Sequence, residues 1–163
     1  MLATTRSVAL LAAILAVGAG MLSGSITAQT PGATKSFDEA RGTLPWPVQG
    51  LLVIGFGEKP TVGSTSRAMA IQAHPGAQVV SPCDGLVVFA GEFRTYGNLV
   101  TVSAGDGYQF LLAGLSTIDA KVGQQVSAGE LIGTMGGGAP VLHLELLKDQ
   151  QAIDPAPRMR KTS

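Results

Sequence analysis

Short apolar runs recur along the chain from residue 44 onward, and glycine, proline or asparagine bounds most of them. Runs of this length between turn residues predict β-strands rather than helices. The expected strands cover residues 51–56, 68–73, 78–80, 86–93, 99–103, 108–115, 131–135 and 141–147. Many short strands at this spacing, with no helical period of adequate length, predict an all-β fold, either an antiparallel β-sandwich or a partly open barrel.

The last of these runs alternates apolar and polar residues at a period of two. In a strand this places His143 and Glu145 on one face with Val141, and the three leucines at 142, 144 and 146 on the other. A histidine on a strand face can be a metal ligand, a general base or a plain hydrogen-bonding residue. The function of His143 therefore depends on which residues the rest of the chain brings beside it.

Composition and charge exclude some functions. Hydrophobic residues make up 45% of the chain, which suffices for a core, and the formal net charge is +0. A neutral chain has no general electrostatic attraction for nucleic acid or for an anionic membrane. Cys83 is the single cysteine, so no internal disulfide can form, and we expect it to be a small buried side chain.

The N-terminus has the pattern of a secretory signal. A basic residue, Arg6, precedes an apolar run over residues 8–22, and small residues follow up to Ala28. The run is shorter than the roughly 20 residues that a spanning helix needs, but no charge occurs between Arg6 and Lys35, so an uncleaved anchor is the alternative. The expected organisation is a signal over 1–28, a flexible linker over 29–43, a domain over 44–158 and a tail over 159–163.

Several motifs occur in a characteristic order. They are the stretch 75–91 (PGAQVVSPCDGLVVFAG), the triplet 96–98 (YGN), the turn 105–108 (GDGY), the stretch 122–133 (VGQQVSAGELIG), and the strand 142–146 with Asp154-Pro155. In this order they resemble the M23 family of peptidoglycan metallopeptidases, or LytM-type domain, over about residues 44–157. The resemblance implies an antiparallel β fold built on a duplicated hybrid motif.

The resemblance also implies where a zinc site would lie. In the family, three protein ligands hold the metal and a water takes the fourth position. The aligned ligand positions are Ser66, Ala70 and His143, and the aligned catalytic histidine positions are Gly114 and Val141. Only His143 has a suitable side chain, and one imidazole does not hold a catalytic zinc. We therefore expect no catalytic residue and no zinc or other cofactor.

Loss of the zinc ligands resembles the EnvC-type murein hydrolase activators. In those proteins the vacated groove binds and activates an N-acetylmuramoyl-L-alanine amidase. The resemblance implies a non-catalytic, exported cell-wall regulator in the periplasm of a Gram-negative cell, with a membrane contact only if the N-terminal segment stays uncleaved. The implied groove residues are Arg67 for a partner carboxylate, Tyr96 as an aromatic anchor and His143 as a hydrogen-bonding residue.

Other interpretations remain open at this stage. Arg67 is equally explained as a solvated surface charge, Tyr96 as a turn residue packed over the sheet, and His143 as a relic held by local hydrogen bonds. The chain is alternatively a residual zinc endopeptidase or a peptidoglycan-binding module. Residues 29–43 show no coiled-coil heptads, which is a departure from the activators. The loop 136–140 before the last strand is short, which is a departure from active peptidases.

Overall fold

The computed structural model describes residues 37–59 and 66–161. The predicted signal, 1–28, lies outside the described residues, as does the linker up to residue 36. No helix within the described part of the chain has the length and apolar character needed to cross a membrane.

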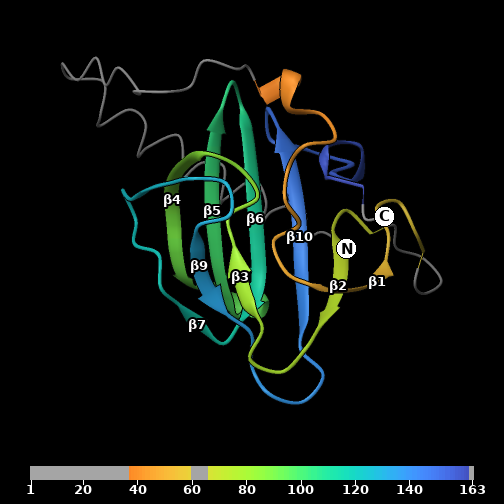
Figure 1. Cartoon of the computed structure of the whole chain (residues 1–163), viewed down its shortest axis with the longest axis vertical. Helices are drawn as coiled ribbons and strands as arrows, with labels where there is room; N and C mark the ends of the chain where they lie inside the picture. Colours follow the sequence, from red (N-terminus) through yellow and green to blue (C-terminus); the bar gives the residue numbers. More distant parts are fainter. Residues whose placement is uncertain (1–36, 60–65, 162–163) are drawn as a thin grey trace. The chain divides into compact units, whose positions relative to one another are not determined.

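Two antiparallel β-sheets form the fold (Figure 1). The eight-stranded sheet has, in spatial order, β1 (Gly50–Ile54), β2 (Met69–Ala73), β10 (Val141–Lys148), β6 (Tyr108–Leu115), β5 (Asn98–Gly105), β4 (Gly85–Glu92) and β8 (Gln125–Val126), while β11 (Gln151–Ile153) pairs with β10. The three-stranded sheet has the order β3 (Gln78–Val80), β9 (Leu131–Thr134) and β7 (Thr117–Ile118). The predicted all-β, antiparallel architecture is confirmed.

All eight predicted strands are present, and their ends agree with the prediction to within two residues. The sequence did not predict β7, β8 or β11, which have two or three residues each and are too short to show alternation. It also did not predict the short 3-10 helices η1 (Phe37–Ala40), η2 (Arg94–Tyr96) and η3 (Ala156–Arg158).

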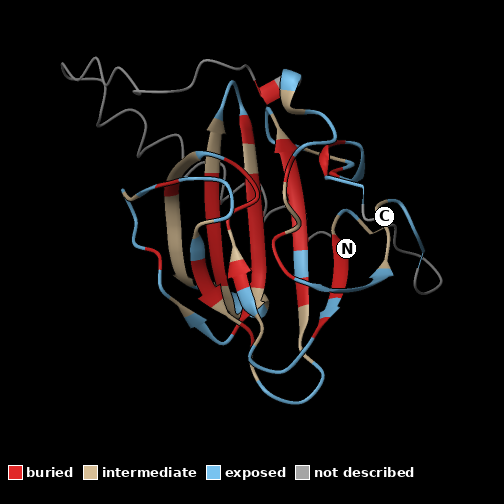
Figure 2. Ribbon diagram, viewed as in Figure 1, coloured by how far each residue is buried: buried red, intermediate tan, exposed pale blue. Residues whose placement is uncertain are grey.

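The core lies on one face of the long central strands, and one apolar cluster includes residues of both sheets. On β10, Leu142, Leu144 and Leu146 are fully buried, as the alternation predicts. Val79 of β3 and Ile132 of β9 contribute from the smaller sheet. Figure 2 shows this burial along β5, β6 and β10. Each such side chain stabilises the fold by about 1.5–3 kcal/mol relative to an exposed position.

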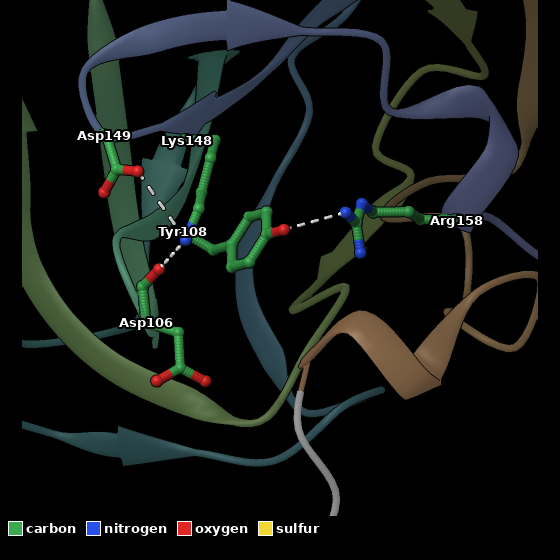
Figure 3. A network of polar contacts seen from close by, with 5 residues as sticks. All are labelled: Asp106, Tyr108, Lys148, Asp149 and Arg158. Carbon is green, nitrogen blue, oxygen red and sulfur yellow. Dashed lines mark hydrogen bonds and ion pairs between the residues drawn. The ribbon is translucent and has the colours of Figure 1, made fainter.

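Arg158, which is buried, links both ends of the described chain to the sheet. Figure 3 shows its hydrogen bond to Tyr108. Its guanidinium donates one hydrogen bond to the carbonyl oxygen of Phe37, at 3.2 Å, and another to the hydroxyl of Tyr108, at 3.0 Å. It also lies 4.8 Å from the ring centre of Phe37 and 4.6 Å from that of Tyr108, which suits cation–π attraction. Lys148 lies 4.2 Å from the Tyr108 ring centre.

These contacts correct the expected boundaries of the domain. Phe37 is buried in the core although the sequence assigned residues 29–43 to a flexible linker. Met159, assigned to the tail, is also buried and forms a β-bridge with Leu44. A single aromatic residue in a polar stretch has no periodicity, so the pattern of the sequence could not reveal that it packs.

Candidate functional site

The face of the large sheet opposite the core brings the candidate residues together, and the strand registers fix their positions. Two rows of directly paired residues cross four strands from β2 or β10 towards β4. The first row is Ala70, His143, Ala113 and Leu99, and the second is Glu145, Leu111, Thr101 and Phe89. We call this face, defined by the two rows, the site face. Six of its eight residues are buried, Phe89 is half-buried and His143 is exposed. The core leucines of β10 point to the other side.

His143 is exposed on the site face, between two alanines. Ala70 of β2 is its partner on one side, and Ala113 of β6 is its partner on the other. Partial burial of the imidazole lowers its pKa. The neutral ring that this favours has one donor and one acceptor nitrogen, so His143 is suited to hydrogen bonding. No group of three or more His, Cys, Asp or Glu residues that could hold a metal occurs among the described residues.

Gly114 and Val141, the positions aligned with the catalytic histidines, are neighbours beside His143. A β-carbon built on Gly114 would lie 2.4 Å from the carbonyl oxygen of Val141. The φ angle of Gly114 is +97°, a conformation that residues with side chains rarely adopt. The backbone of this position is therefore arranged for glycine, and a histidine here would require β6 and β10 to move.

Four of the five aligned positions thus converge on one spot: Ala70, Gly114, Val141 and His143. Ser66, the fifth, lies in the turn before β2, where its hydroxyl donates a hydrogen bond to the carbonyl oxygen of Ala68. The side chains at this spot include one imidazole and no carboxylate.

Arg67 and Tyr96 come from distant parts of the sequence, but both are linked electrostatically to Glu145: the charge of Arg67 acts on Glu145, and the charge of Glu145 acts on Tyr96. Arg67 is exposed two residues before β2, and Tyr96 is half-buried at the end of η2. Burial raises the pKa of Glu145, and the Arg67 charge opposes that rise. Burial raises the pKa of Tyr96 too, with a further contribution from the charge of Glu145. The structure therefore places two of the predicted site residues around a carboxyl group two residues from His143.

Glu145 is a site residue that the sequence reasoning did not select. The side chain is 7% exposed, and its Oε1 atom has no hydrogen-bond partner in the protein. The Oγ1 atom of Thr101, in the same row, is also buried without a partner. The alternation in β10 already put Glu145 on the face of His143, and this was the signal that could have identified it.

Aromatic side chains form one wall beside this carboxyl group. The rings of Phe89 and Phe93 meet edge to face with their centres 5.8 Å apart, and those of Phe93 and Tyr96 are 6.4 Å apart. The amide of Tyr96 donates to the carbonyl of Phe93, and the amide of Phe93 donates to that of Gly97. These bonds hold the Tyr96 turn against the sheet.

The opposite border of the site face is an apolar sheet edge. Leu51, Leu52 and Val53 of β1 are 68%, 46% and 42% exposed. Leu51 pairs with Gln72, and Ile54 pairs with Ala70, so these two apolar residues extend the site face beyond β2. The surface therefore passes from an apolar edge, past an exposed imidazole, to a buried carboxyl group with an arginine and a tyrosine nearby. Such a mixture is typical of protein-binding surfaces.

Comparison with known proteins identifies the family. Residues 64–155 match Peptidase family M23. The chain belongs to this family. The cell division protein DipM of Caulobacter vibrioides is 37% identical over 141 residues, which are 80% of this chain and 23% of DipM. The murein hydrolase activator EnvC of Escherichia coli is 35% identical over 121 residues, which are 72% of this chain and 29% of EnvC.

The fold matches solved structures of the family as well. The structure of Helicobacter pylori Csd3 from an orthorhombic crystal superposes with a TM-score of 0.65 and 26% identity, covering 73% of this chain and 35% of Csd3. The chain spans about a quarter of the length of the curated relatives that it matches. The shared region is therefore the LytM-type domain.

Proposed function

We propose that this protein is a non-catalytic, exported cell-wall regulator that binds an N-acetylmuramoyl-L-alanine amidase through the site face and activates it. The observation that carries the proposal is the convergence of Ala70, Gly114 and Val141 around His143. A catalytic zinc site needs three protein ligands and an activated water. At this spot the side chains provide one ligand.

The relatives support a regulatory role at the cell wall. EnvC carries the name murein hydrolase activator, and DipM is a cell division protein. An activator acts outside the inner membrane, so the proposal places this protein in the periplasm of a Gram-negative cell.

The chemistry of the site face suits a protein partner. Arg67 and Tyr96 belong to the residue types that dominate binding energy at interfaces. Leu51 and Ile54 of β1 extend the same surface at its apolar border. An amphipathic segment of the amidase would place its apolar stripe on this border and its polar side chains towards Arg67 and Glu145.

The proposal is tested by measuring binding and stimulation of the purified amidase from the same organism. The Arg67→Ala variant should bind at least about tenfold more weakly, because an interfacial arginine contributes on the order of 1–2 kcal/mol or more. Arg41→Ala is the matched control, since Arg41 is also exposed but follows η1, away from the site-face strands in sequence. Absence of binding and stimulation by the wild-type chain would refute the proposal.

Membership of a peptidase family favours one alternative, a residual zinc endopeptidase. Metal analysis of the purified protein separates the two functions. Stoichiometric zinc together with cleavage of peptide cross-links would support the endopeptidase. Retention on insoluble sacculi without any effect on the amidase would instead support a peptidoglycan-binding module.

A further inference from the structure

Glu145 is an acceptor whose hydrogen-bonding capacity the protein does not fill. The side chain is more than nine-tenths buried, and Oε1 has no partner. Burial of a carboxylate without a hydrogen-bond donor is unfavourable, because its interactions with water are lost and no protein interaction of equal strength replaces them. Buried polar atoms are nearly always paired in native proteins, so an orphaned one indicates strain or a function.

Thr101 repeats the pattern on the same face. Its Oγ1 is buried and unpaired, and Leu111 of β6 lies between it and Glu145 in the strand register. Neighbouring strands are about 4.7–4.9 Å apart, so the two residues are roughly 10 Å apart at the backbone, on one face with Leu111 between them. Two unpaired polar groups on either side of one leucine form a polar spot in an otherwise apolar part of the face.

The charged groups nearby do not neutralise Glu145 by direct contact. Arg67 acts on it through space, and the two side chains form no ion pair with each other among the described residues. Tyr96 also lies close enough to feel its charge. Tyr96 lies on the short 3-10 helix η2, whereas Glu145, Leu111 and Thr101 lie on strands.

We infer that Glu145 and Thr101 receive a basic side chain, a lysine or an arginine, from the amidase segment that docks on the site face. Such side chains have long apolar stems that can pass the Tyr96 ring and pack over Leu111. They present several donors, which a carboxylate and a hydroxyl can both accept. Arg67, at the exposed rim, is left to pair with an acidic side chain of the same segment. The inference rests on the proposed function and specifies the chemistry of its partner.

The key variant is Glu145→Gln, which keeps the shape of the side chain and removes its charge. We expect affinity for the purified amidase to fall at least about tenfold, because loss of one member of a buried charge pair is costly. The matched control is Glu92→Gln, which changes the net charge equally at an exposed position of β4 in the same sheet. The control should bind within about twofold of the wild type. Thr101→Val, an isosteric change, should weaken binding by a smaller factor.

Stability distinguishes a binding role from a structural one. If Glu145 served the fold, Glu145→Gln would lower the thermal unfolding midpoint. If Glu145 instead binds a ligand group, removal of its unpaired buried charge should raise the midpoint at pH 7 and weaken binding. This is the trade-off between stability and function expected at binding sites. A lowered midpoint with unchanged affinity would overturn the inference.

The partner residue is located by replacing each lysine and arginine of the amidase with methionine, one at a time. One replacement should weaken binding to the wild-type chain about as much as Glu145→Gln does, and the two changes together should cost little more than either alone. If the wild-type chain binds and stimulates the amidase but no basic residue couples to Glu145, the inference fails and the proposed function stands. If the wild-type chain does not bind the amidase, both fail.

Discussion

A β-carbon on Gly114 would lie 2.4 Å from the carbonyl oxygen of Val141, closer than non-bonded atoms approach in folded proteins. A histidine at position 114 would therefore collide with the backbone around it. The φ angle of +97° and the closeness of β10 both favour glycine. We therefore predict that side-chain replacements alone do not produce a zinc peptidase site.

We predict that Gly114→Ala destabilises the protein by about 1–3 kcal/mol, from the strained φ together with the collision. Urea unfolding at pH 7 measures the change. Gly136→Ala is the control, because Gly136 has no positive φ and its nearest neighbour is the β-carbon of Ser116 at 3.5 Å, an ordinary contact. The control should change stability by less than about 0.5 kcal/mol. Equal effects of the two substitutions would contradict the account of Gly114.

A second prediction concerns restoration of the metal site. A chain carrying Ser66→His, Ala70→Asp, Gly114→His and Val141→His has all five family side chains together with His143. We expect this chain to be less stable than the wild type and to show no cleavage of peptidoglycan cross-links with added zinc. Zinc-dependent cleavage by this variant would show that the backbone at Gly114 is not a barrier.

The contacts of Arg158 predict a large loss of stability on its removal. Arg158→Met leaves the carbonyl of Phe37 and the hydroxyl of Tyr108 without a charged donor and removes two cation–π contacts. The expected loss is about 2–4 kcal/mol, since hydrogen bonds to charged groups contribute more than neutral ones. Arg160→Met, at an exposed neighbouring residue, is the control. A loss below about 1 kcal/mol in denaturant unfolding would mean that Arg158 is dispensable.

The buried thiol of Cys83 should be unreactive in the folded protein. The side chain is 2% exposed, and burial, with a smaller contribution from the charge of Asp84, raises its pKa to about 12. The thiolate, which is the reactive form, is therefore scarce at pH 8. Labelling with a chromogenic disulfide reagent should proceed only after denaturant is added. Rapid labelling of the native chain would contradict this burial.

The fold was predictable because its strands are long enough to show their pattern. Alternation over 141–147 placed His143 and the core leucines on the correct faces, and glycine-containing breaks marked the start of each long strand. Two-residue strands such as β7 and β8 carry no such pattern, and Phe37 packs by a contact with Tyr108, which is distant in the sequence. Contacts of this kind are set by tertiary structure and leave no local signal.

The candidate site was predictable in part for a related reason. Ala70, Gly114, Val141 and His143 were placed by alignment to the family, and the strand registers bring them together. Glu145 was overlooked because a glutamate in an alternating strand ordinarily faces solvent. Its burial depends on Tyr96 and on β5 and β6, which no local pattern in β10 reveals.

The burial of Glu145 also predicts a pH dependence. Its pKa in the folded protein is raised above the ordinary 4.5, so the folded state gains stability from protonation at low pH and loses it as the pH rises through the folded pKa. The charged and titratable groups near it are Arg67, Tyr96 and His143. Glu145→Gln should therefore be more stable than the wild type at pH 7, and the difference should shrink as the pH falls through the raised folded pKa towards 4.5. A difference independent of pH would contradict the raised pKa.

The measurement that tests the central claim most directly is the rate at which the purified amidase releases stem peptides from isolated sacculi, with and without this protein. Mass spectrometry of the products separates amidase cleavage from cleavage of cross-links. The account predicts that the wild-type chain alone releases nothing, that it accelerates the amidase, and that Arg67→Ala loses this effect while Arg41→Ala keeps it. An unchanged amidase rate, or zinc-dependent cleavage of cross-links by this chain alone, would contradict it.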